Sequence, residues 1–102
     1  MPEQAELLKD GSGQYQLSGD VTFQTSPALL RQLGNFRSEG GQVEINFSRV
    51  GRIDSSCVAL MLECLRNARK NQVELVFSGL PTTLSDLIAL FQLSKRLPIL
   101  QN

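Results

Sequence analysis

A carboxylate and two hydroxyls stand side by side at Asp54, Ser55 and Ser56, between an apolar stretch and a long amphipathic one. The alternation before them is typical of a strand and the spacing after them of a helix, so the three polar side chains fall at a helix N-terminus. Backbone N–H groups there have no partner within the helix, and the helix dipole favours negative charge. The turn can therefore cap the helix or accommodate a phosphate.

Both uses of this turn fit the local physics, and one does not exclude the other. An N-cap contributes about 0.5–2 kcal/mol to stability, which alone explains a polar side chain at this place. A phosphate on Ser55 would add about −1.5 to −2 charges at the positive end of the helix, and it would change the surface that a partner protein meets. The residues alone favour the cap, with modification of Ser55 as the alternative.

Groups that could perform catalysis are scarce in this chain. It contains no histidine, and the only candidate base near Ser55 and Ser56 is Asp54, which cannot replace the imidazole of a serine triad. The sequence Gly11-Ser12-Gly13 lacks the spacing and the following helix of a nucleotide-binding loop. We therefore predict a binding or regulatory module without a cofactor, and a small enzyme is the least favoured class.

The two cysteines, Cys57 and Cys64, lie seven positions apart on the helix that follows the polar turn. That spacing separates their Cα atoms by about 10.5 Å along the helix axis, which is too far for a disulfide. Without histidine or further cysteines, the usual zinc ligands are missing. We predict no metal site and expect two buried, reduced thiols in a reducing compartment.

Length and composition are those of one globular domain. The 102 residues, 41% of them apolar and 20% charged, predict a single domain over 1–102. Ten basic and ten acidic residues leave no net field to attract nucleic acid or anionic lipid. No apolar run approaches the roughly 20 residues of a membrane-spanning helix, and the acidic N-terminus is unlike a signal peptide. We expect a cytoplasmic protein without membrane insertion or nucleic-acid binding.

The elements that position the turn follow from the spacing of apolar residues. A first strand is predicted over 14–18, and a short extended piece over 21–23 is expected to pair back on it through Gly19-Asp20. Ser26 and Pro27 then provide a capping hydroxyl and a proline at the first helical position. This helix turns three leucines inward: Leu29, Leu30 and Leu33.

The middle of the chain predicts a central strand and the longest helix. The first helix ends near Gly34 or frays to Phe36, and a strand follows over 42–47. The second helix is predicted over about 56–70, with Asn71 as its stop. Residues expected to face the core are Val43, Ile45 and Phe47 of the strand and Val58, Met61, Leu62, Leu65 and Ala68 of the helix, with Leu60 and Cys64 widening that stripe.

The last third repeats the alternation of strand and helix. A strand is predicted over 73–77, a third helix behind a capping box from Thr83 to Asp86, and a short final strand over 97–100. The third helix is expected to carry four residues inward: Leu84, Leu87, Ile88 and Phe91. The whole pattern predicts an α/β fold with a mixed four- to five-stranded sheet and about three helices, which cover mainly one face.

The run from Asn46 to Leu60, Asn-Phe-Ser-Arg-Val-Gly-Arg-Ile-Asp-Ser-Ser-Cys-Val-Ala-Leu, resembles the central signature of STAS domains. These domains include the anti-sigma-factor antagonists and the tails of sulfate transporters. In that family a strand ends in Asp-Ser or Asp-Thr and opens the second helix. The resemblance extends to Leu17-Ser18-Gly19-Asp20 and Ser78-Gly79-Leu80, and it implies a STAS fold over nearly the whole chain.

Two branches of this family place different demands on the turn. Anti-sigma-factor antagonists usually carry Gly-Glu-Leu-Asp after the first strand and Asp-Ser-Ser-Gly at the helix start, with the first of these two serines as phosphoacceptor. This chain has Gly19-Asp20-Val21-Thr22 and, after Asp54-Ser55-Ser56, Cys57 in place of glycine. By contrast, Phe23, the Ser-Pro-Ala-Leu-Leu run over 26–30 and the Phe-Ser-Arg-Val run over 47–50 are similar to the small cytoplasmic STAS subunits of Mla-type phospholipid transporters.

The second resemblance implies a non-catalytic subunit that binds the cytoplasmic ATPase of an ABC transporter, together with its permease, peripherally at the inner membrane. Such a transporter maintains the lipid asymmetry of the Gram-negative outer membrane. The contact is expected to centre on Ser55, the phosphoacceptor-equivalent position, with Asp54, Ser56, Cys57, Val58, Ala59 and Glu63 around it. The alternative is an anti-sigma-factor antagonist of a partner-switching circuit, phosphorylated on Ser55.

Overall fold

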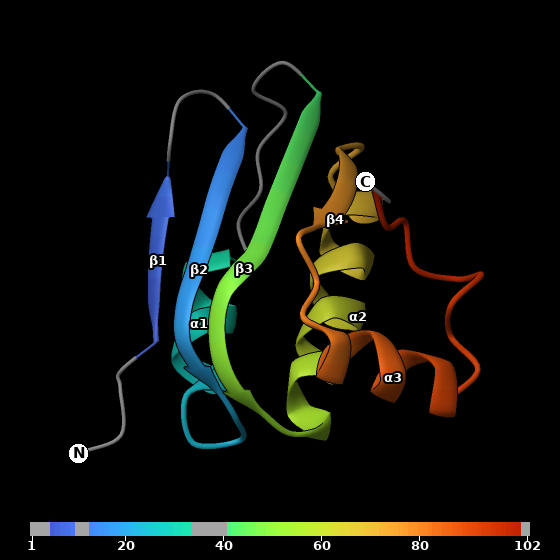
Figure 1. Ribbon diagram of the computed structural model, residues 1–102. Coiled ribbons are helices and arrows are strands. Elements are labelled where there is room, and N and C mark those ends of the chain that lie inside the picture. Colours follow the sequence, from blue (N-terminus) through green and yellow to red (C-terminus); the bar gives the residue numbers. More distant parts are fainter. Residues whose placement is uncertain (1–4, 10–12, 34–40, 101–102) are drawn as a thin grey trace.

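A computed structural model describes residues 5–9, 13–33 and 41–100. These residues form four strands and three helices (Figure 1). The elements are β1 (Glu6–Lys9), β2 (Gln14–Val21), α1 (Ser26–Leu33), β3 (Gln42–Ile53), α2 (Ser55–Lys70), β4 (Glu74–Ser78) and α3 (Thr82–Leu90). The predicted α/β class is confirmed.

The strands form one mixed sheet in the order β1-β2-β3-β4. β1 pairs antiparallel with β2, whereas β2, β3 and β4 run parallel. α1 connects β2 to β3 and α2 connects β3 to β4, as parallel neighbours require. In Figure 1 both of these helices lie behind the sheet, and α3 lies below β4. The polar turn is thus located where the central strand β3 passes into α2.

The first hairpin differs from the prediction. β2 does not turn back at Gly19-Asp20 but continues to Val21, because Leu17 and Val21 both belong to the buried side of one strand. Its antiparallel partner is β1, in which Leu7 lies opposite Leu17. The expected extended piece over 21–23 is wrong: beyond Val21 the chain bends into a turn.

The helix boundaries agree with the sequence more closely at α2 than at α3. Asn71 is the C-cap of α2, as predicted. α3 begins two residues earlier than the predicted capping box requires, and its N-cap is Pro81, which has no side-chain hydrogen bond. The N–H groups of Leu84 and Ser85 both donate to the carbonyl of Pro81. The capping box at Thr83 is therefore wrong, because proline already sets the helix start.

Most of the predicted core residues are buried. Leu87 is half-buried, and Leu62 and Phe91 are 39% and 46% exposed and lie at the margins of their helical stripes. Leu29 and Leu33 of α1 are buried and Leu30 is half-buried, whereas the predicted end of this helix at Gly34 or Phe36 lies outside the described residues. The inward residues of α2 are Cys57, Val58, Leu60, Met61, Cys64, Leu65 and Ala68.

The tail makes a shorter contact than a full strand. Ile99 forms an isolated parallel bridge with Phe77 of β4. The Phe77 N–H donates to the carbonyl of Pro98, and its own carbonyl accepts from Leu100. These two bonds protect the edge of β4, so the sheet extends to the tail at one residue only.

Two phenylalanines form the centre of the core. Phe47 of β3 and Phe77 of β4 are 1% and 0% exposed, and their rings meet edge to face with centroids 5.9 Å apart. They stand on the sheet face that the helices cover, together with Ile45 and Leu75. The alternation of β3 and β4 thus produces one buried face and one open face.

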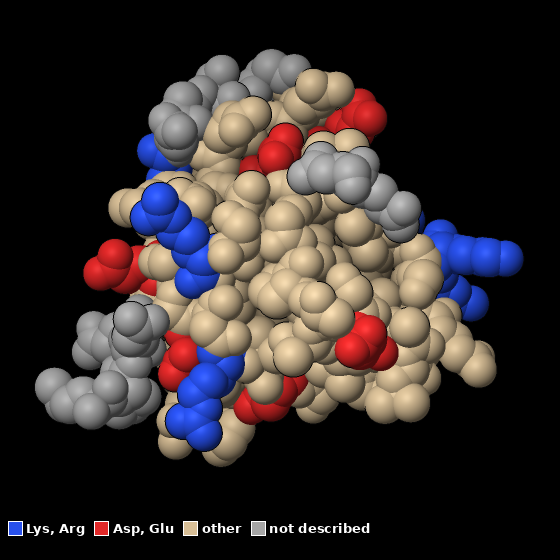
Figure 2. Space-filling view, viewed as in Figure 1, with Lys and Arg blue, Asp and Glu red and all other residues tan. Residues whose placement is uncertain are grey.

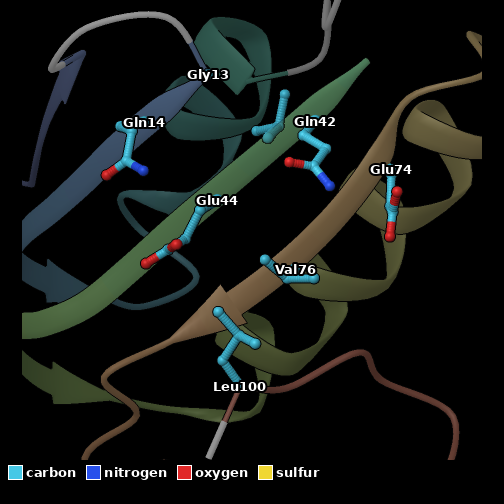
Figure 3. A pocket seen from close by; sticks show the side chains of 8 residues that line it. Gly13, Gln14, Gln42, Glu44, Glu74, Val76 and Leu100 are labelled. Carbon is cyan, nitrogen blue, oxygen red and sulfur yellow. The ribbon is translucent and has the colours of Figure 1, made fainter. Parts of the chain in front are cut away.

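The open face of the sheet is polar. Figure 3 shows Gln14, Gln42 and Glu44 on the side turned away from the helices, around a hollow of about 330 Å³ that Val76 also lines. Ser78 at the end of β4 is buried, and its hydroxyl donates to Glu44 at 2.7 Å. As expected, the helices leave this face uncovered.

None of the helices in the described ranges is long and apolar enough to cross a membrane.

Candidate functional site

Two irregularities in the pairing of β2 with β3 shape the approach to the polar turn. Gln16 lies opposite Asn46 and Val21 opposite Ile53, so β3 uses more residues than β2 over the same length. Such bulges take N–H groups out of the ladder and bend the strand. Here the Ser48 N–H donates to the side chain of Asn46 at 2.7 Å. At the second bulge, the freed N–H group is bound by a side chain of the neighbouring strand β2.

Asp20 at the end of β2 stabilises the second bulge. Its Oδ1 accepts from the N–H of Arg52 at 2.9 Å. A Cβ at Gly51 would come within 2.8 Å of the same oxygen. Glycine at position 51 therefore lets the Asp20 carboxylate reach the backbone of β3 and hold the end of this strand against β2.

Asp54 is the N-cap of α2. Its backbone is extended, and its Oδ1 accepts from the N–H of Ser56 at 2.9 Å and from the Ser56 hydroxyl. Its Oδ2 accepts from the N–H of Phe23 at 3.1 Å, in the loop between β2 and α1. One carboxylate thus starts the helix and ties it to a loop from another part of the chain. The local physics left open which residue caps the helix, and the structure assigns this role to Asp54.

The two serines occupy different surroundings. Ser55 is the first residue of α2 and is exposed. Ser56 is half-buried, and its hydroxyl is engaged by Asp54. Capping therefore does not require Ser55, whose hydroxyl faces the surface.

The other predicted contact residues divide into two sets. Ala59 is exposed and the Glu63 side chain is 40% exposed, with an ion pair of 2.8 Å to Arg66. Cys57 and Val58 are 0% and 3% exposed. Their side chains belong to the core, so they support the turn from behind and do not form part of its surface.

Phe23 is a surface residue that the sequence analysis did not assign to the site. Its side chain is 71% exposed, and its N–H is bound by Asp54. The sequence does show an aromatic residue in the short segment between a strand and the Ser-Pro helix start. The expected extended piece over 21–23 would have made Phe23 part of a strand and not of the site.

The surface charges on the open face are mixed. Figure 2 shows acidic and basic side chains interspersed around a largely uncharged centre. Among the described residues, no group of three or more His, Cys, Asp or Glu could hold a metal ion. Charge of neither sign dominates this face, so it offers no single-sign field that would attract a charged partner.

Removing the Asp54 carboxylate is expected to weaken the start of α2. Asp54→Ala should lower the free energy of unfolding by about 1–2 kcal/mol, whereas Asp54→Ser, which keeps a capping oxygen, should retain most of it. Urea unfolding measures both variants. Equal stability of Asp54→Ala and the wild type would contradict the assignment of the cap.

The contribution of the Asp54 cap to the free energy of unfolding depends on pH in a defined way. The hydrogen bond from the Ser56 hydroxyl, with those from the Phe23 and Ser56 N–H groups, holds the pKa of Asp54 below its ordinary value of 3.8 despite partial desolvation. The ionised form is therefore favoured in the folded state. The stabilisation is present above pH 3.8 and is lost as the pH falls below it through the lowered pKa. The stability difference between the wild type and Asp54→Ala should shrink over that interval.

The two thiols are expected to be inert in the folded protein. Both are buried and free, as predicted, and burial raises the pKa of Cys57 and of Cys64 to about 12. Since the thiolate is the reactive form, iodoacetamide at mildly alkaline pH should leave both unmodified in native protein and alkylate both in concentrated guanidinium. Mass spectrometry distinguishes these states, and rapid alkylation of native protein would show that α2 opens around the modified thiol.

In this mixed sheet, the central strand β3 leads through the Asp54-Ser55-Ser56 turn into α2. Residues 6–101 match the family described as "Mlab, STAS domain", and the chain belongs to the STAS domain family. Domains of this family generally regulate or bind other proteins and are not catalytic. Among curated proteins, none matches this chain.

Solved structures share the fold at low sequence identity. An anti-sigma factor antagonist from Mycobacterium paratuberculosis superposes with a TM-score of 0.82 at 20% identity, over 100% of this chain and 90% of that one. The anti-sigma factor antagonist SpoIIAA in its unphosphorylated form gives 0.68 at 16% identity, over 96% and 88%. The STAS domain of a SulP transporter from Vibrio cholerae gives 0.58 at 12% identity, over 89% and 75%. The STAS fold is therefore confirmed.

Proposed function

We propose that this protein is an MlaB-like accessory subunit that binds the cytoplasmic ATPase of an Mla-type ABC transporter. It catalyses nothing itself and supports the assembly or activity of a complex that moves phospholipids between the inner and outer membranes. In this role it lies in the cytoplasm and reaches the inner membrane through the ATPase and its permease. The matching family, described by the name Mlab, supports this choice among STAS functions.

The observation that carries the proposal is that different residues of the polar turn cap the helix and face the surface. Asp54 caps α2, so the exposed Ser55 is not needed for the helix start. A short hydroxyl at the first position of a helix lets a partner backbone approach closely. Ala59, one helical turn further, is also small and exposed, and Glu63 borders the same stripe. These three residues, with Asp54 and Ser56 beneath them, form the proposed contact.

A second candidate is an anti-sigma-factor antagonist that is phosphorylated on Ser55. The exposure of Ser55 favours it, as does the likeness in fold to SpoIIAA, which has also been solved in a phosphorylated form, with a TM-score of 0.67. Against it stand Thr22, where antagonists carry an acidic group, and Cys57, where they carry glycine. Cys57 is fully buried, so its side chain fills space in the core that a glycine would leave.

Affinity purification from the native cell separates the two candidates. The tagged protein should recover an ABC ATPase with its permease, and its Ser55 should carry no stoichiometric phosphate under any growth condition. Recovery of a GHKL-type kinase alone, or a stoichiometric phosphate on Ser55, would establish the antagonist and overturn the transporter subunit.

A further inference from the structure

An exposed aromatic side chain stands directly beside the proposed contact. Phe23 is 71% exposed, and the carboxylate that binds its N–H is Asp54, the residue before Ser55. A single exposed apolar side chain is ordinary on a protein surface. What distinguishes Phe23 is that its backbone is fixed to the same turn by a side chain that also starts α2.

The loop that carries Phe23 is rigidly built. The N–H of Thr22 donates to Oγ1 of Thr25 at 3.0 Å, and this hydroxyl donates to the carbonyl of Asp20 at 2.8 Å. The N–H groups of Thr25 and Ser26 both donate to the carbonyl of Thr22, at 3.0 and 2.8 Å. Phe23 therefore lies in a loop whose backbone is held from both sides and by Asp54.

Such a residue has the properties of a binding anchor. Aromatic side chains dominate the energetics of interfaces because they bury a large area with few rotatable bonds. A loop that is already ordered loses little conformational entropy when a partner binds. Ser55, the residue after the Asp54 that binds the Phe23 N–H, is small and exposed, so its side chain does not obstruct a partner at the turn.

We infer that Phe23 is a binding residue for the same ATPase, inserted into an apolar pocket of that partner, and that Asp54 is the positioning residue that fixes it beside Ser55. This inference rests on the proposed function. It adds the loop between β2 and α1 to the contact and gives that contact an apolar anchor next to a hydrogen-bonding turn. The partner must therefore present an apolar cavity beside a backbone segment that meets the Ser55 hydroxyl.

The test measures affinity for the purified ATPase subunit by calorimetry. Phe23→Ala should weaken binding by about thirtyfold or more, as expected of a hot spot. Its thermal midpoint should match that of the wild type because the side chain is exposed. Leu90→Ala is the matched control, since Leu90 at the end of α3 is 74% exposed and its loss should leave affinity unchanged. Phe23→Leu, which keeps an apolar side chain, should restore part of the affinity.

A double-mutant cycle tests the role of Asp54. The N–H groups of Ser56 and Phe23 bind different oxygens of the Asp54 carboxylate. Asp54→Asn replaces one of these oxygens with an NH2 donor, so one of the two N–H groups loses its acceptor. If Asp54 acts through Phe23, the affinity lost in Asp54→Asn should be much smaller in the Phe23→Ala background than in the wild type. Full additivity would show a merely structural role for Asp54.

The outcomes distinguish this inference from the proposed function. Wild-type binding with Phe23→Ala within threefold of it would overturn the anchor and leave the transporter subunit standing. Failure of the wild type to bind the ATPase would overturn both. An equal loss of affinity in Phe23→Ala and Leu90→Ala would mean that the effect is not specific to Phe23, and it would also refute the anchor.

Discussion

Ser55→Glu is expected to abolish binding of the ATPase while the domain remains folded. Ser55 is the exposed first residue of α2, where a carboxylate interacts favourably with the helix dipole, and Asp54 continues to cap the helix. In the complex, however, the longer charged side chain would be buried against the partner without an ionic partner. We expect at least about a hundredfold loss of affinity, equivalent to about 2.7 kcal/mol.

Calorimetric titration of the ATPase and a thermal melt of the isolated variant measure the two halves of this prediction. Thr82→Glu is the matched control, because Thr82 is the exposed first residue of α3 and receives the same new charge at the same helical position. It should bind as the wild type does. Unchanged affinity of Ser55→Glu would remove Ser55 from the contact, and a collapse of its melting temperature would mean that Ser55 matters chiefly for the helix start.

Phe77→Ala is expected to cause the largest loss of stability in this domain. The ring is fully buried against Phe47, and the backbone of Phe77 also holds the tail through Pro98 and Leu100. Truncating a buried phenylalanine removes its transfer energy and leaves a cavity, which costs about 3–5 kcal/mol. Since small domains have only about 5–15 kcal/mol of stability, the variant should be close to unfolding at ordinary temperature.

Urea unfolding compares this variant with Val76→Ala. Val76 is the preceding residue of β4, but its side chain lies on the open face and is only half-buried. Its truncation should cost no more than about 1 kcal/mol. If the two variants were equally stable, the assignment of the buried face of β4 would be wrong.

The sequence predicts the elements whose pattern is set locally. Val43, Ile45 and Phe47 alternate, and the apolar residues of α2 recur at helical spacing, so both elements lie where they are predicted. The predicted end of the strand at Phe47 is wrong, because β3 continues through its bulges to Ile53. β1 has only four residues and no clear alternation, and its pairing with β2 depends on contacts across the fold. Leu62 fits the periodic pattern but lies at the edge of the stripe, where only the packing of neighbouring elements decides burial.

The place of the polar turn in the fold was predicted, but its contacts were not. The polar turn at Asp54 follows from the end of one pattern and the start of another. The hydrogen bond between Asp54 and Phe23 joins residues 31 positions apart. The bulges that bend β3 toward the turn arise from its pairing with β2. Neither is visible in a linear sequence, because both depend on which residues of distant segments lie opposite one another. The proline at position 81 likewise sets the start of α3 through its own backbone rather than through a side-chain cap.

Site-specific photo-crosslinking in the native cell tests the central claim most directly. A benzoylphenylalanine at position 63, at the border of the proposed contact, would report the protein that lies against α2, with position 82 as a matched control on α3. We predict that position 63 crosslinks to the ATPase of an ABC transporter and that position 82 does not. A crosslink from position 63 to a GHKL-type kinase, or equal crosslinking of the ATPase from both positions, would contradict the proposed docking of this turn on the transporter.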